Sequence, residues 1–369
     1  MVNCPLCNNS DITNLYSESE VPLFQNKIYS SEEEAKSVEC GIISLDYCNS
    51  CGFIWNSQFN AELMKYDNNY KNEQSFSEMF KAHLMFVSDL ISSKVDKGSQ
   101  LIEIGCGKGI FLEMLSEKGH AIQGFDPAYS GNNPKISKKY FPPSDETILA
   151  DIFILRHVLE HIPDPYTFLK NLYEQNDHSG CVYIEVPDFN WISENQAFWD
   201  VSYEHCNYFT KETLESMFER PNTISCFGGQ YLALFAYLRT FNRNLGCENK
   251  ENKYVDFISS INDCKEFVKK NSGLVVWGAA AKGANFVRIT DPGHQYINCI
   301  IDINPDKQGH YLAKTGHRII SPNEFFEMKS LDTIIVMNEN YIEEIRQMLE
   351  GWKGRVFVLG NTIKEIKLV

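Results

Sequence analysis

Apolar runs of strand length alternate with segments of helical spacing in the middle of the chain. The predicted strands are 101–105 (LIEIG), 121–126 (AIQGFD), 151–155 (DIFIL) and 181–186 (CVYIEV), with helices expected at 109–118 and 165–176. Continuously apolar strands that alternate with helices are typical of a parallel sheet covered on both faces. Residues 222–238 predict a hairpin that turns at Gly228-Gly229. An amphipathic helix is expected over 74–94, before the first of these strands.

A second series of the same kind follows a polar stretch at 242–253, which we interpret as a linker. Its predicted strands are 274–278, 298–302, 332–337 and 355–360, with helices at 279–288 and 340–350. Because one core rarely organises more than about 250–300 residues, a chain of 369 residues is expected to form several domains. We predict three: 1–65, 66–240 and 241–369, the last two each with an open α/β sheet.

The net charge and the lack of long apolar runs indicate which kinds of partner the protein does not bind. The formal net charge of −15 disfavours binding to nucleic acid or to an anionic membrane surface. The first residues carry no basic segment followed by an apolar one, and no apolar run approaches the ~20 residues that cross a bilayer. We therefore expect a cytoplasmic protein with no membrane partner.

Four of the twelve cysteines form two Cys-x-x-Cys pairs in the first domain: Cys4, Cys7, Cys48 and Cys51. A two-residue gap lets both thiolates of a pair reach one ion, and two pairs supply a tetrahedral Cys₄ zinc site. Four protein ligands leave no open position, so we expect Zn²⁺ to be structural. The alternative is a set of reduced thiols or a redox pair. The other eight cysteines are expected to be buried small hydrophobes.

The segment 103–109 (EIGCGKG) follows a buried strand and opens a helix. Its spacing is G-x-G-x-G, whereas the dinucleotide fingerprint is G-x-G-x-x-G, which disfavours an NAD-dependent enzyme. The segment resembles motif I of class I methyltransferases, in which the acid before the first glycine serves the amino acid end of S-adenosylmethionine. The acid at the end of the next strand, Asp126, would accept the ribose hydroxyls. A phosphate-binding loop or a plain tight turn is the alternative.

Residues 151–165 strengthen this resemblance. An apolar strand ends in a loop with the sequence H-x-L-E-H (157–161), similar to the strand-4 motif of the same superfamily. Ligands of open α/β folds bind at the carboxyl ends of the strands, where this loop lies. The predicted cofactor-binding residues are Glu103, Gly105, Cys106, Gly107, Gly109, Asp126, Pro127, Arg156 and His157.

The order of the parts resembles the sugar C-methyltransferase family over nearly the whole chain. The most specific pieces are 278–283 (GAAAKG) and 302–309 (DINPDKQG). The resemblance implies a class I methyltransferase fold with a seven-stranded, mostly parallel sheet, a small zinc-binding β module and a second, Rossmann-like domain. A glycine-rich strand-to-helix turn suits a diphosphate, so we predict substrate binding by Gly278, Ala279, Lys282 and Asp302. Alternatively, this domain only walls the cleft.

Residues 203–210 (YEHCNYFT) resemble the family segment that carries a catalytic glutamate and histidine. The resemblance implies that His205 is the base that removes a proton next to a ketone, and that Glu204 either orients it or stabilises its charged form. It implies that His161 hydrogen-bonds the enolate oxygen, and that Tyr70 matches a family tyrosine. Tyr203 and Tyr208 are predicted substrate contacts. Ser202 stands where the family has a tyrosine. A hydrogen-bonded structural pair is the alternative for residues 204 and 205.

The sequence thus predicts a methyltransferase that uses S-adenosylmethionine and C-methylates a nucleotide-linked keto-deoxysugar through an enolate. One alternative is an O- or N-methyltransferase acting on a sugar or another small molecule. Another is a non-catalytic binding protein that retains the fold. A monomer and a homodimer are both compatible with the sequence.

Overall fold

The computed structural model describes residues 3–67, 69–143, 148–242, 245, 252–254 and 257–368. It has an N-terminal module, a central lobe and a C-terminal lobe. Most of the predicted linker at 242–253 lies outside the described residues. No helix among those ranges combines the length and apolar character needed to cross a bilayer.

The N-terminal module is a small antiparallel sheet. Its order is β1-β3-β4-β10, formed by β1 (Ile12–Pro22), β3 (Cys40–Cys48), β4 (Ile54–Asn56) and β10 (Asn207–Tyr208). The module also contains β2 (Ile28–Tyr29), α1 (Glu32–Lys36) and the 3₁₀ turn η1 (Ala61–Leu63). Strand β10 belongs to the central lobe, and β2 pairs with β15 (Tyr311–Leu312) of the C-terminal lobe. The module is therefore joined to both lobes through strand pairing.

The central lobe is built on a seven-stranded sheet in the order β11-β12-β9-β8-β5-β6-β7. Its parallel strands are β5 (Gln100–Ile104), β6 (Ala121–Phe125), β7 (Ile136–Ser137), β8 (Ile152–Arg156) and β9 (Cys181–Pro187). The hairpin β11 (Asn222–Cys226) and β12 (Tyr231–Tyr237) adds two antiparallel strands at one edge. The predicted parallel sheet and hairpin are confirmed.

Helices cover both faces of this sheet. The helices are α2 (Glu78–Ser92), α3 (Ile110–Glu117), α4 (Pro165–Gln175), α5 (Phe189–Glu194) and α6 (Lys211–Glu215). Short 3₁₀ turns are η2 (Leu159–His161), η3 (Phe198–Asp200) and η4 (Leu238–Thr240). Strand β8 shows why the sheet is buried, since Ile152, Ile154 and Leu155 have no exposed surface. Such strands lie between two helical layers.

The C-terminal lobe carries a second sheet in the order β16-β14-β13-β17-β18-β19. Its strands are β13 (Leu274–Trp277), β14 (Ile297–Ile301), β16 (Ile319–Ile320), β17 (Thr333–Val336), β18 (Arg355–Leu359) and β19 (Ile363–Ile366). All pair in parallel except β19, which is antiparallel to β18. The helices are α7 (Ile258–Lys270), α8 (Ala281–Thr290), α9 (Pro322–Glu327) and α10 (Ile342–Met348), with η5 (Glu339–Tyr341). The predicted Rossmann-like second domain is confirmed.

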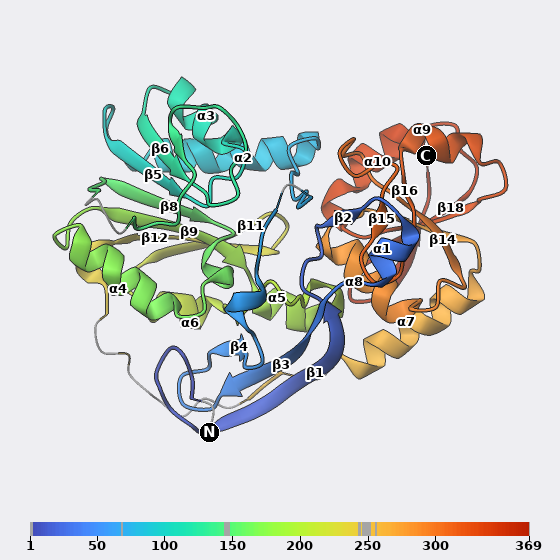
Figure 1. Ribbon diagram of the computed structural model, residues 1–369, viewed down its shortest axis with the longest axis horizontal. Helices are drawn as coiled ribbons and strands as arrows, with labels where there is room; N and C mark the ends of the chain where they lie inside the picture. Colours follow the sequence, from blue (N-terminus) through green and yellow to red (C-terminus); the bar gives the residue numbers. More distant parts are fainter. Residues whose placement is uncertain are drawn as a thin grey trace.

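The two lobes lie side by side, with the long strands of the N-terminal module beneath them (Figure 1). Polar contacts join the lobes: Gln230 and Asn338 exchange side-chain hydrogen bonds of 2.9 and 3.1 Å, and Asn340 Nδ2 donates to the carbonyl oxygen of Phe227 at 2.9 Å. One apolar cluster runs through all three parts, with members such as Val21, Trp199 and Phe286. Because these contacts are spread over the facing surfaces, they hold the carboxyl ends of both sheets around a common cavity.

Candidate active site

The cavity between the lobes has a volume of about 260 Å³. From the central lobe it is lined by Tyr70, by His157, Glu160 and His161 after strand β8, and by His205. From the C-terminal lobe it is lined by Gly278, Ala280, Ala281, Lys282, Gly283, Asp302 and Lys307. It therefore joins the motif predicted to be catalytic with the glycine-rich turn of the second sheet.

The predicted donor loop lies at the carboxyl end of β5. Gly105, Gly107 and Gly109 have φ angles of +70°, +54° and +85°, which side chains other than glycine rarely adopt. The carboxylate of Asp126 accepts hydrogen bonds from the backbone N–H of Gly107 at 2.9 Å and of Ala128 at 2.8 Å. The loop and the acid at the end of β6 are thus in direct contact, and Pro127 beside them is half-buried. None of Gly105, Gly107, Gly109, Asp126 and Pro127 is among the residues that line the cavity between the lobes.

Glu103 is buried at 3% exposure, and its Oε2 has no hydrogen-bond partner among the described residues. Burial raises the pKa of Glu103 to about 8, against the opposing charge of Arg156 and with a smaller contribution from Asp126. An orphan carboxylate oxygen at this point suits a cationic ligand group, such as the ammonium of S-adenosylmethionine. The residues at the loop therefore fit that cofactor.

Two predicted cofactor contacts, Cys106 and Arg156, direct their side chains into the protein interior. The Sγ of Cys106 packs against β6, where a Cβ on Gly124 would meet it at 2.6 Å. Arg156 directs its guanidinium to the ring of Phe111 at 4.5 Å and donates to Glu185 at 3.1 Å. Cys106 can offer a ligand its backbone, whereas Arg156 is engaged in a buried ion pair.

Three of the four predicted catalytic residues, Tyr70, His161 and His205, line the cavity, whereas Glu204 is buried and does not line it. Tyr70 donates a 2.6 Å hydrogen bond to Glu204 Oε2, and the backbone N–H of Gln25 donates to Glu204 Oε1 at 2.8 Å. His161 Nδ1 lies 2.8 Å from the backbone oxygen of Glu204. The rings of His161 and His205 meet edge to face with centroids 4.9 Å apart. The side chain of Glu204 is therefore held by Tyr70 and Gln25, and its backbone orients His161.

The environment of His205 differs from the near-neutral one that the sequence suggests for a base. Burial, followed by the charge of His161, lowers the pKa of His205 to about 3. The ring is therefore neutral at physiological pH, with a lone pair free to accept a proton, but the imidazolium that would form is poorly stabilised by its surroundings. Burial also raises the pKa of Glu204, which the charge of His161 and the Tyr70 hydrogen bond oppose.

Comparison with known proteins decides the family. A profile described as "Methyltransferase domain" matches residues 73–222, and one described as "C-methyltransferase C-terminal domain" matches residues 236–359. The chain belongs to the S-adenosylmethionine-dependent methyltransferases. It is 22% identical to the C-methyltransferase NovU of Streptomyces niveus over 362 residues, 87% of this chain and 86% of that protein.

Other matches cover smaller parts of the chain. A ubiquinone biosynthesis O-methyltransferase of Methylobacterium sp. is 30% identical over 88 residues, 20% of this chain and 34% of that protein. Among solved structures, a putative S-adenosylmethionine-dependent methyltransferase from Listeria monocytogenes is 13% identical, covers 42% of this chain and 98% of its own, and has a TM-score of 0.33.

In this methyltransferase, two predicted substrate contacts lie away from the cavity. Tyr203 is 1% exposed, packs its ring against Gly41 of β3 and accepts a hydrogen bond from the backbone N–H of Asn60 at 2.9 Å. Tyr208 is 3% exposed, and its hydroxyl lies 3.0 Å from both the backbone N and the backbone O of Ser202. Neither lines the cavity. We therefore correct both assignments: these tyrosines fix the loop that carries His205.

Of the predicted substrate-binding residues of the C-terminal lobe, Gly278, Lys282 and Asp302 line the cavity, whereas Ala279 is buried and does not. Gly278 has a φ of +120°, and a Cβ on Gly283 would lie 1.8 Å from the Gly278 carbonyl oxygen, so α8 packs closely on the turn. Asp302 is engaged by the backbone N–H of Ala279 at 2.7 Å. The Lys282 ammonium pairs with Asp200.

Sequence reasoning missed Lys307, although it lies in the quoted DINPDKQG segment. It is 3% exposed and donates to Asn26 Oδ1 at 3.1 Å and to the Ala279 carbonyl oxygen at 3.0 Å. Within the part of the chain that the structure describes, no carboxylate lies within ion-pair distance of its ammonium. Burial lowers the pKa of Lys307.

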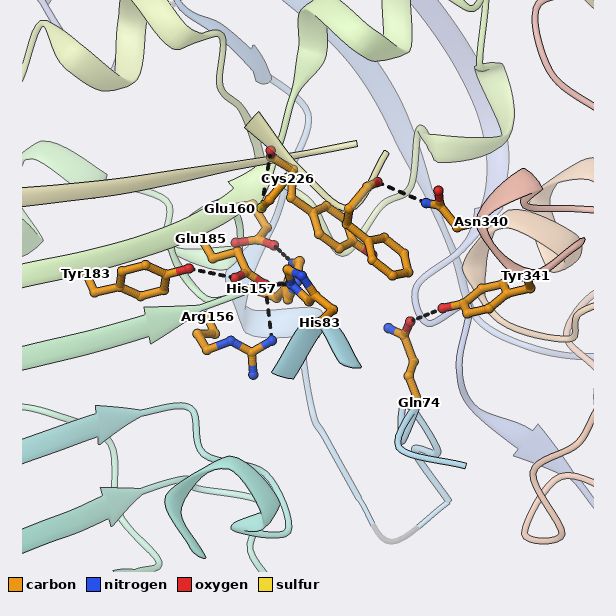
Figure 2. Close-up of polar contacts among 12 residues, drawn as sticks. Gln74, His83, Arg156, His157, Glu160, Tyr183, Glu185, Cys226, Asn340 and Tyr341 are labelled. Carbon is orange, nitrogen blue, oxygen red and sulfur yellow. Dashed lines mark hydrogen bonds and ion pairs between the residues drawn. The ribbon is translucent and has the colours of Figure 1, made fainter. Parts of the chain in front are cut away.

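Sequence reasoning also missed a buried charged network beside the cavity (Figure 2), which one of its members, His157, lines. Glu185 of β9 has no exposed surface and lies 3.1 Å from His83 Nε2, 3.1 Å from Arg156 Nη2 and 3.0 Å from His157 Nε2. The hydroxyl of Tyr183 donates to its other oxygen at 2.9 Å. A glutamate inside the otherwise apolar strand CVYIEV was the available signal, since a buried charge requires partners.

The four paired cysteines of the N-terminal module come together. The Sγ atoms of Cys4, Cys7, Cys48 and Cys51 all lie within 4.8 Å of one another, and Cys4–Cys51 and Cys7–Cys48 are 3.6 Å apart. Zinc–sulfur bonds of about 2.3 Å in a tetrahedron place the sulfurs roughly 3.8 Å apart. The cluster therefore fits a tetrahedral ion.

Proposed function

We propose that this methyltransferase adds a methyl group to a carbon atom next to the keto group of a nucleotide-linked deoxysugar. One observation carries the proposal: a single cavity brings His161 and His205 together with the glycine-rich turn and the cations of the C-terminal lobe. The similarity to a C-methyltransferase over 87% of the chain supports carbon as the methylated atom.

The cofactor site fits the sulfonium donor. The loop 105–109, Asp126 and the orphan oxygen of Glu103 would hold S-adenosylmethionine. Bound there, it supplies a methyl group that is electrophilic without further activation. The task left to the protein is to create a carbon nucleophile and to align it.

The acceptor substrate would be activated by the histidine pair, His161 and His205. His205 is neutral and accepts the proton from the carbon next to the ketone, so the C–H electrons pass into an enolate. His161, held by the backbone oxygen of Glu204, hydrogen-bonds the enolate oxygen. The enolate carbon would then take the methyl group that S-adenosylmethionine supplies when bound, and the proton on His205 would return to water.

The opposite end of the cavity suits the anionic part of a nucleotide-linked acceptor. The buried ammonium of Lys307 lies beside the turn at 278–283, from which α8 starts. A helix N-terminus and an ammonium without a carboxylate partner favour a diphosphate. The C-terminal lobe would thus recognise the nucleotide portion of the acceptor.

A structural zinc ion is the second part of the proposal. The cysteine cluster has the ligand type and spacing of a closed Cys₄ site. An ion there would tie residues 4–7 to the end of β3 and so stabilise the module that contributes Gln25 to the Glu204 environment.

The test is turnover with S-adenosylmethionine and a panel of nucleotide-linked keto-deoxysugars, measured as formation of S-adenosylhomocysteine. We expect His205→Ala to lower turnover by at least ~100-fold, as for loss of a general base. Calorimetry with S-adenosylhomocysteine is the control, because the donor site does not include this ring. Near wild-type turnover in the variant would refute the assignment of the base.

A further inference from the structure

A second acidic side chain, besides Glu204, lies beside the pair formed by His161 and His205, although the sequence motif did not assign it a role. Glu160 of η2 is 1% exposed and lines the cavity. Its carboxylate and one ring nitrogen each of His161 and His205 all lie within 4.8 Å of one another. Its Oε2 has no hydrogen-bond partner among the described residues, and its Oε1 has only an ion-pair contact of 3.4 Å with His157 Nδ1. A buried carboxylate in this state still has lone pairs to offer.

The structure keeps Glu160 ionised. His157 Nδ1 lies 3.4 Å from Glu160 Oε1, and His157 Nε2 lies 3.0 Å from Glu185 (Figure 2). Although burial opposes its charge, these two carboxylates raise the pKa of His157 to about 9. Burial also opposes ionisation of Glu160, but His157 and the charges of His161 and His205 lower its pKa. His157 and Arg156 thus balance the charges of Glu160 and Glu185.

The geometry separates the roles of the two glutamates near the pair. Both carboxylate oxygens of Glu204 are occupied, by Gln25 N–H and by the Tyr70 hydroxyl. Its backbone oxygen, a pure acceptor, receives Nδ1–H of His161 and directs Nε2 away. The carboxylate of Glu160, in contrast, is contacted among the described residues only at Oε1, by His157, and its Oε2 is left without a partner. The charge available to the histidines therefore comes from Glu160.

We propose that Glu160 is a positioning residue whose fixed negative charge lets the His161–His205 pair carry the proton taken from the acceptor. The inference rests on the proposed function for the identity of that acceptor. When His205 accepts the proton, the C–H bond breaks, an N–H bond forms and the electron pair remains on the enolate. The imidazolium formed at His205 would lie beside the ring of His161, with centroids 4.9 Å apart, in a buried site where a nearby carboxylate stabilises its charge.

The first test needs no acceptor. ¹⁵N ring NMR of the free enzyme, assigned with single histidine variants, gives the apparent pKa of His161 and His205 in wild type and in Glu160→Gln. We expect the pair to bind its proton at least tenfold more weakly in the variant. Glu344→Gln is the matched control, because Glu344 also lines the cavity but accepts its hydrogen bond from Ser77. Equal shifts in both variants would overturn the proposal.

The second test uses catalysis. The titratable groups facing Glu160 are His157, His161 and His205, together with Tyr66 and Cys206, and Lys282 acts on His205. With the acceptor that the enzyme turns over, we expect Glu160→Gln to lower kcat by roughly 10²-fold and to move the acid limb of the kcat profile to lower pH. Glu160→Asp should recover at least tenfold of the loss, whereas a purely structural role would leave the acid limb in place, and that result would contradict the proposal.

Two further outcomes distinguish the charge role of Glu160 from a metal-ligand role and from the proposed function itself. Elemental analysis that finds a second metal ion, lost in Glu160→Gln and retained in Cys48→Ser, would overturn it, because the carboxylate would then be a ligand. If the NMR shift is seen but no carbon is methylated, the charge role of Glu160 stands and the proposed function fails.

Discussion

The substitution Glu185→Gln tests whether the buried charged network around Glu185 is required for the stability of the central lobe. Glu185 has no exposed surface, and four side chains contact it: His83, Arg156, His157 and Tyr183. Glutamine keeps the shape but removes the charge and presents an N–H₂ group to donors. Removing one partner of a buried ion pair costs about 3–5 kcal/mol, because the remaining charge stays buried. We expect the central lobe to lose this much stability.

Hydrogen exchange measured by mass spectrometry resolves the central lobe from the rest of the chain. Peptides from β8 and β9 should exchange roughly 10²- to 10³-fold faster in Glu185→Gln, since each tenfold corresponds to about 1.4 kcal/mol. Glu343→Gln is the control, because its exposed pair with Arg346 contributes at most about 1 kcal/mol. A loss below about 1 kcal/mol in Glu185→Gln would refute the reasoning.

The same network predicts how this loss depends on pH. Burial opposes its charge, but Arg156, His157 and His83 hold the pKa of Glu185 well below its ordinary value. Its contribution is therefore present above the unfolded value of about 4.3 and is lost as pH falls further. The pKa of His157 is raised to about 9, so its contribution is full below about 6.5 and is lost as pH rises through 9. The difference between wild type and Glu185→Gln should be largest between about pH 5 and 7. A difference that stays constant from pH 4 to 10 would contradict this account.

Three further predictions concern the donor loop, the cysteine cluster and the second lobe. Asp126→Ala removes the carboxylate that accepts the hydrogen bond of the Gly107 N–H. The affinity for S-adenosylhomocysteine, measured by calorimetry, should therefore fall at least ~10-fold, which corresponds to about 1.4 kcal/mol. Unchanged affinity would argue against this site. Cys48→Ser should remove one equivalent of zinc and expose residues 1–65 to proteolysis, and an unaltered zinc content would exclude the proposed ligand. Gly283→Ala places a Cβ 1.8 Å from a carbonyl oxygen, so the C-terminal lobe should lose about 1–3 kcal/mol in urea unfolding, and an unshifted midpoint would show that α8 can move.

Local patterns were sufficient for most of the fold. Strands β5, β8 and β9 are apolar over nearly their full length because helices cover both faces of the sheet, and such runs are visible in the sequence. The helices between them begin and end within a few residues of the predicted limits. The three glycines of the donor loop have positive φ, which is the backbone property that the motif encodes.

Side-chain direction was harder to predict, since it depends on distant parts of the chain. The motif at 203–210 predicted that Tyr203, next to the proposed catalytic pair, contacts the substrate. Its ring instead packs against Gly41 in β3, where the missing side chain leaves space for it. The partner of His83 is 102 residues away, at Glu185, and Glu160 is set apart from Glu204 only by which hydrogen bonds each receives. A single sequence does not report these tertiary contacts.

Methyl transfer with S-adenosylmethionine labelled with ¹³C in its methyl group examines the central claim most directly. The purified enzyme is incubated with this donor and the nucleotide-linked keto-deoxysugar that gives turnover, and the product is analysed by carbon–proton correlation NMR. The account predicts a methyl signal coupled to a ring carbon next to the former ketone. A label that appears as an O-methyl or N-methyl group would contradict carbon methylation in the cavity between the lobes.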